Sequence, residues 1–80
     1  MDIRLAVKNR IIQLCDERGI AINTLSNLAG VPPSTVYSML NGKSKNPGIV
    51  SIKKLCDGLD IGVKEFFASD LFEDLEQEIK

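Results

Sequence analysis

Apolar residues recur along this chain at the spacing of amphipathic helices, separated by short polar or glycine-containing segments. In residues 3–18 they stand three and four positions apart, which predicts a helix whose buried stripe is Val7, Ile11, Leu14 and Cys15. The same spacing predicts helices from 22 to 28 or 29, from 33 to 40, from 49 to 59 and from 63 to 68. The chain is therefore expected to be all-α.

Glycine and proline mark the ends of the expected helices. Gly19 and Gly30 each follow an apolar segment, where a residue with positive φ closes a helix and a Cβ would be resisted. Pro33 suits the first position of a helix, because the N–H that proline lacks would have no partner there. Two short helices joined at Gly30 form a helix-turn-helix pattern, in which the second helix lies in the major groove of DNA.

The last eleven residues, 70–80, form a segment of different character. Apolar residues alternate with acids there at nearly helical spacing, which predicts a final amphipathic helix carrying Leu71, Phe72, Leu75 and Ile79. The expected organisation is a helix-turn-helix domain over residues 1–69, followed by an acidic amphipathic tail over residues 70–80.

The stretches RGIAINTLSNLAGVPPSTVYSMLNGKSKNP and IKKLCDGLDIGVKEFF carry a resemblance to a known family. From Val7 to Phe67 the chain resembles the Xre-type helix-turn-helix domains of phage repressors and their bacterial relatives. The resemblance implies a compact five-helix bundle like that of lambda repressor. It also implies binding to operator DNA, usually as a dimer and without a cofactor.

Composition and charge refine this expectation. The 80 residues, of which 44% are hydrophobic, suit one small domain with a mainly aliphatic core. The net charge is −1, but residues 1–69 carry nine basic and six acidic residues, whereas residues 70–80 carry five acids and one lysine. A mildly basic body with an acidic tail is compatible with weak electrostatic attraction to DNA. No apolar run approaches a membrane span and no signal-peptide pattern opens the chain, so a soluble cytoplasmic protein is expected.

Metal binding and catalysis are not expected. The chain has no histidine, and Cys15 and Cys56 belong to no CxxC pair, so the usual zinc ligand sets are missing. Both cysteines fall on apolar helix faces and should be reduced and buried. The sequence contains no nucleophile elbow and no phosphate-binding glycine loop, and its acids are scattered. We expect neither an enzyme nor a bound cofactor or small-molecule ligand.

The outward residues at the start of the helix over 33–40 are the candidates for contact with DNA bases. A recognition helix enters the groove by its N-terminal end, and the outward residues there are Pro33, Ser34, Tyr37 and Ser38. Serine hydroxyls bond many base edges and distinguish few of them, so shallow sequence preference is predicted. The alternative for Ser34 and Thr35 is capping of the helix start.

Phosphate contacts are expected from two places. Asn23 and Thr24 open the second helix, whose free amides attract anions. Relatives commonly have glutamine at the first position of that helix, and Ile22 stands there in this chain. The polar loop after the recognition helix supplies the other candidates, which are Asn41, Lys43, Ser44, Lys45 and Asn46.

The sequence leaves two questions open, one about how the tail packs and one about function. Leu5 and Ile12 form a second apolar set on the first helix, and the tail offers another, so the tail is expected to pack on that helix within one chain or across a homodimer. The neutral recognition helix also permits an alternative function. In that reading the fold is an antitoxin-like or regulatory protein-interaction module that does not bind an operator.

Overall fold

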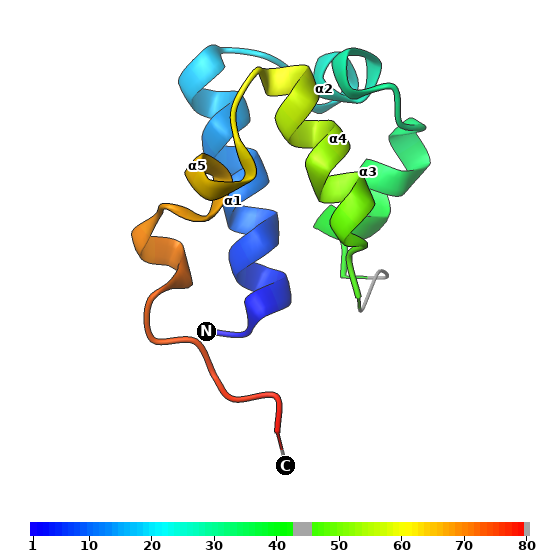
Figure 1. Ribbon diagram of the computed structural model, residues 1–80. Coiled ribbons are helices and arrows are strands. Elements are labelled where there is room, and N and C mark those ends of the chain that lie inside the picture. The colour runs from blue at the N-terminus through cyan, green and yellow to red at the C-terminus, as the bar shows by residue number, and fades with distance from the viewer. Residues whose placement is uncertain (43–45, 80) are drawn as a thin grey trace.

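The computed structural model describes residues 1–42 and 46–79, which fold into a bundle of five helices (Figure 1). The helices are α1 (Ile3–Arg18), α2 (Ile22–Ala29), α3 (Pro33–Leu40), α4 (Ile49–Leu59) and α5 (Val63–Phe67). The expected all-α class and the bounds of the first four helices are confirmed. The fifth helix ends one residue earlier than expected. No helix of the described chain is long and apolar enough to cross a membrane.

The core is aliphatic and lies between α1, α2, α3 and α4. The predicted stripe of α1 is buried, and so are the inward residues of the other helices, with Phe66 of α5 fully enclosed. Cys15 and Cys56 are free thiols within this core, as expected. Burial raises the pKa of both thiols, which disfavours the reactive thiolate.

Gly58 allows α4 to pack closely against α2. A Cβ built on Gly58 would lie 2.8 Å from the backbone nitrogen of Ala29 and 2.9 Å from the carbonyl carbon of Leu28. Backbone atoms cannot move aside as a flexible side chain can, so only glycine fits without a shift of one helix. A glycine inside a helix costs about 1 kcal/mol relative to alanine, and here that cost is offset by the close contact.

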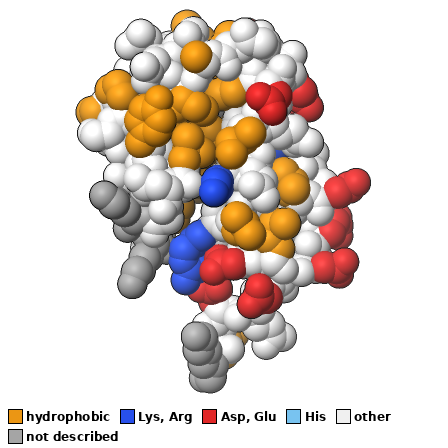
Figure 2. Space-filling view, turned by 180° about the vertical axis from the view of Figure 1, so that it is seen from behind, with side chains coloured by type: hydrophobic (Ala, Val, Ile, Leu, Met, Phe, Trp, Pro, Cys, Tyr) orange, Lys and Arg blue, Asp and Glu red, His pale blue; other side chains and the backbone are white. Residues whose placement is uncertain are grey.

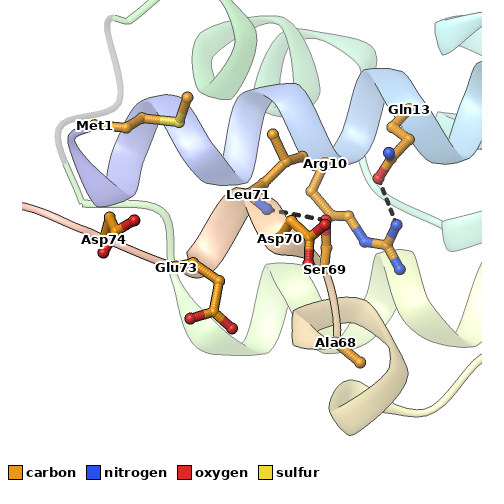
Figure 3. A pocket seen from close by; sticks show the side chains of 9 residues that line it. All are labelled: Met1, Arg10, Gln13, Ala68, Ser69, Asp70, Leu71, Glu73 and Asp74. Carbon is orange, nitrogen blue, oxygen red and sulfur yellow. Dashed lines mark hydrogen bonds between the residues drawn. The ribbon is translucent and has the colours of Figure 1, made fainter.

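Arg10 joins α1 to α5. Its side chain is 7% exposed, and it donates hydrogen bonds from Nε to the carbonyl of Phe66 (2.7 Å) and from Nη2 to that of Glu65 (2.8 Å). The remaining described bond runs from Nη1 to Oε1 of Gln13, and Arg10 lines a cavity of about 590 Å³ with Ser69 and the start of the tail (Figure 3). A cation on the last carbonyls of a helix satisfies groups that have no partner within the helix.

The prediction of an amphipathic helix in the tail is wrong. Only a single 3-10 turn, η1 (Asp70–Phe72), forms there, and the chain from Glu73 to Ile79 is not helical. Phe72 packs at 4.9 Å between ring centroids against Phe67, which anchors the turn, and Asp74 then takes a positive φ of 51° that a helix excludes. Isolated short helices are marginal in water, and these tertiary contacts outweigh the weak helical preference of the segment.

The tail beyond η1 runs past the N-terminus of the chain (Figure 1). The N–H of Glu76 donates to the carbonyl of Met1 (3.0 Å), and the Glu76 carboxylate lies 3.6 Å from the amino terminus. Glu78 pairs with Arg4 of α1. The tail therefore packs within its own chain at the start of α1, while Leu5 and Ile12 stay 44% and 37% exposed.

Candidate nucleic-acid interface

The turn between α2 and α3 is built around Gly30. Gly30 has φ 67° and ψ 27°, and the N–H of Val31 donates to the carbonyl of Ser26 at 3.2 Å. This is the left-handed closure expected of the residue. Ser26 is fully buried, and its hydroxyl donates back to the carbonyl of Ile22 (3.2 Å). The closed turn fixes the angle at which α3 leaves α2.

The outward face of α3 is polar and accessible at its N-terminal end. Pro33, Ser34 and Tyr37 are exposed, whereas Ser38, one turn further on, is half-buried. Pro32 stands before the helix in an extended conformation, and within the described residues no side chain caps the start of α3. The capping alternative for Ser34 and Thr35 is therefore not the arrangement seen.

The start of α2 lies against this face. The hydroxyl of Tyr37 is 3.4 Å from Oδ1 of Asn23, a long hydrogen bond that joins a candidate base contact to a candidate phosphate contact. Asn23 and Thr24 are exposed, and Ala21 precedes the helix without a side-chain cap. Ile22 is partly buried and packs on the core, so its replacement of glutamine adds no exposed apolar patch.

The loop after α3 is described in part. Asn41 ends α3 and is exposed, Gly42 has a positive φ of 81°, and Asn46 is exposed before Pro47. Lys43, Ser44 and Lys45 lie outside the described residues. Both asparagines at the described ends of the loop are therefore accessible to a partner.

The charge along this part of the chain is one-sided. The segment between Arg18 and Lys53 has no acidic residue, and the only charged residues within this segment are Lys43 and Lys45. The first turns of α2, α3 and α4 hold no acid, and none of these described helix starts has a side-chain cap. The free amides at helix starts carry partial positive charge, so this surface can accept phosphate without repulsion from its own carboxylates.

The acidic residues gather elsewhere. Figure 2 shows Asp and Glu side chains along one edge of the bundle and around the C-terminal end, whereas the upper part of the opposite edge, where α2 and α3 lie, carries hydrophobic and uncharged side chains. Among the described residues there is no cluster of potential metal ligands. The separation of charge favours one surface of the bundle for an anionic polymer.

The sequence pattern did not predict the roles of several residues on this surface and in the core beneath it. Ile49 and Val50 are 64% and 65% exposed at the start of α4, although helical spacing gave no sign that Ile49 would face outward. Arg10 and Gly58 did leave a signal, because Arg10 is a charged residue next to the apolar stripe of α1 and Gly58 is a glycine inside the helical pattern of α4. Such exceptions indicate a specific partner or a close approach.

Comparison with protein families gave one result. A family model described as a Cro/C1-type HTH DNA-binding domain matches residues 10–70, which include the second half of α1 and all of α2 to α5. The comparisons with curated proteins and with solved structures found no match. The matched region contains the turn at Gly30 and the accessible start of α3.

Proposed function

Since the chain belongs to the Cro/C1-type helix-turn-helix DNA-binding family, we propose that it is a transcriptional regulator that places the start of α3 in the major groove of duplex DNA. One observation carries the proposal. The exposed polar start of α3 lies within a stretch from Gly19 to Ile52 in which the only charges are two lysines. Such a surface meets a polyanion without an electrostatic penalty.

Ser34 and Tyr37 are proposed as the main contacts with bases, together with Pro33. Their exposure on α3 supports this assignment, and the half-buried Ser38 is a weaker contact. Helix α3 has no arginine, glutamine or asparagine for a two-point contact with guanine or adenine. Sequence preference should therefore be shallow, and DNA shape and the spacing of half-sites should contribute part of it.

The phosphate contacts are proposed at both sides of α3. Asn23 and Thr24, with the uncapped amides of α2, hold the backbone on one side. The loop holds it on the other side, through Asn41, Lys43, Ser44, Lys45 and Asn46. These contacts position the protein along the duplex and make binding depend on salt concentration.

Binding as a homodimer is proposed through α1. Leu5 and Ile12 stand seven residues apart on α1, and both remain exposed because the tail does not cover them. A two-fold contact there would cover the exposed parts of these two apolar side chains. Two recognition helices spaced by about 34 Å would then meet successive major grooves. Sedimentation equilibrium tests this, and a monomer at high concentration would remove the dimer.

The test of the function is a gel shift with genomic fragments at rising salt, followed by sequencing of the bound DNA. The expected result is binding that weakens steeply with salt, with a short and degenerate common site. Binding that is absent at every salt concentration would contradict the proposal. A long, sharply defined half-site would keep the function but overturn the predicted shallow preference.

A protein-interaction module is the second candidate. The observation that favours it is the pair Ile49 and Val50, two exposed apolar side chains at the start of α4 beside the loop. Apolar residues in that position suit a protein partner better than a phosphate backbone. The same gel shift separates the candidates, because a protein-interaction module would show no salt-dependent DNA binding.

A further inference from the structure

Arg4 lies at the edge of the proposed DNA-binding surface. It lines one cavity of about 620 Å³ with Asn41 and Gly42, at the start of the loop after α3. It lines a second cavity of about 500 Å³ with Asn46 and Pro47, at the end of that loop. Arg4 is therefore next to both described ends of the segment that is proposed to contact phosphate.

The side chain of Arg4 is bound by a carboxylate of the acidic tail. Nη1 and Nη2 of Arg4 lie 3.0 Å and 3.1 Å from Oε1 of Glu78, and both nitrogens donate to that one carboxylate oxygen. Glu78 lines the same cavity as Asn46 and Pro47, so its negative charge stands beside the loop. A phosphate oxygen has the same charge sign and the same geometry toward a guanidinium as this carboxylate.

The contact is weak enough to be exchanged. The side chains of Arg4 and Glu78 are 37% and 55% exposed, and ion pairs in water contribute about 0–1 kcal/mol. Asp2 also lies 3.2 Å from Nη1 of Arg4, but this carboxylate accepts the N–H of Arg4 at 2.7 Å and caps α1. Asp2 is thus committed to the helix, whereas Glu78 is an exposed residue on the non-helical part of the tail.

We propose that Arg4 is a further phosphate-contacting residue, and that Glu78 of the tail holds it when DNA is absent. The tail and the DNA backbone then compete for one guanidinium, which makes the tail an internal inhibitor of binding. This inference rests on the proposed DNA-binding function. Of the five tail acids, Glu78 is the one that lines a cavity with the end of the loop, whereas Asp70, Glu73 and Asp74 line the cavity beside Arg10.

The test measures binding to a fluorescein-labelled duplex of mixed sequence by anisotropy, at low and at physiological salt. Four variants are compared with the unmodified chain: Glu78→Gln, Arg4→Gln, the double variant, and Glu73→Gln as a matched control. Glu73 is an exposed tail acid that makes no ion pair among the described residues. Its substitution removes the same charge without freeing Arg4.

Glu78→Gln should raise affinity at low salt by roughly three- to tenfold and steepen the salt slope by about 0.9, the value for one more phosphate contact. Glu73→Gln should change affinity less than Glu78→Gln at low salt, and by less than about twofold at physiological salt, where charges more than about 8 Å apart are largely screened. In the Arg4→Gln background, Glu78→Gln should gain no more than the control does. Melting temperatures should be unchanged, which excludes a folding effect.

Two results would overturn the inference while the function stands. One is equal gains from Glu78→Gln and Glu73→Gln, and the other is a gain from Glu78→Gln that persists without Arg4. The first would reduce the tail to general repulsion, and the second would place the competed contact elsewhere. If neither the unmodified chain nor any variant binds the duplex in a salt-dependent way, the proposed function fails and this inference fails with it.

Discussion

The two ends of the molecule differ in whether the polar backbone groups at their helix ends have side-chain hydrogen-bond partners. At the α2–α3 end, the described starts of both helices have no side-chain cap and no acid, and Ser34 beside them is exposed. At the α1–α5 end, Arg10 satisfies the last carbonyls of α5, and Asp2 caps α1. Groups that are satisfied internally stabilise the fold, and groups left open can bind a partner.

Substitution at the α1–α5 end should therefore cost the most stability. Arg10→Met should lower the free energy of unfolding by about 2–4 kcal/mol, because the carbonyl of Phe66 loses its buried donor and that of Glu65 keeps only the N–H of Ala68. Urea denaturation measures the loss. Arg4→Met is the matched control on the same helix, and its exposed ion pairs predict a loss below about 1 kcal/mol. Equal losses would mean that the buried arginine has no special role.

Substitution at the junction of α2 and α4 should have the next largest effect. Gly58→Ala places a methyl group 2.8 Å from the backbone of Ala29, and overpacking of this kind costs about 1–3 kcal/mol. Gly62→Ala is the control, because its Cβ would meet nothing within 4 Å. Thermal unfolding of both variants compares them. A Gly58→Ala protein as stable as the control would show that α2 and α4 can separate at little cost.

Substitution on the open face should leave stability unchanged and reduce binding. Ser34→Ala should weaken DNA affinity by about fivefold, close to the 1 kcal/mol of one hydrogen bond, with an unchanged melting temperature. Ser38→Ala sharpens the comparison, since its half-buried hydroxyl should contribute less. Fluorescence anisotropy on a selected duplex measures both. A larger effect at Ser38 would place the binding face further along α3 than proposed.

The tail shows where reading the sequence failed. Leu71, Phe72, Leu75 and Ile79 have nearly helical spacing, yet within residues 70–79 η1 is the only helical turn. Phe72 packs against the rings of Phe66 and Phe67, and the N–H of Glu76 donates to the carbonyl of Met1. The aromatic contact spans five or six residues and bends the chain back on α5, whereas the Glu76–Met1 bond joins the two ends of the chain, which no local pattern could reveal. Arg10 and Gly58 were visible as exceptions on their helices, but their partners were not.

What the sequence determined by itself is local: the apolar spacing set the helices, Gly19 and Gly30 set where α1 and α2 end, and Pro33 set where α3 begins. It also determined that no acid stands between Arg18 and Lys53. Tertiary structure alone decided which carbonyls Arg10 satisfies, how closely α4 approaches α2, and that Glu78 meets Arg4 beside the loop. Helix formation depends on neighbours within one or two turns, whereas these pairings depend on how the packed helices bring distant residues together.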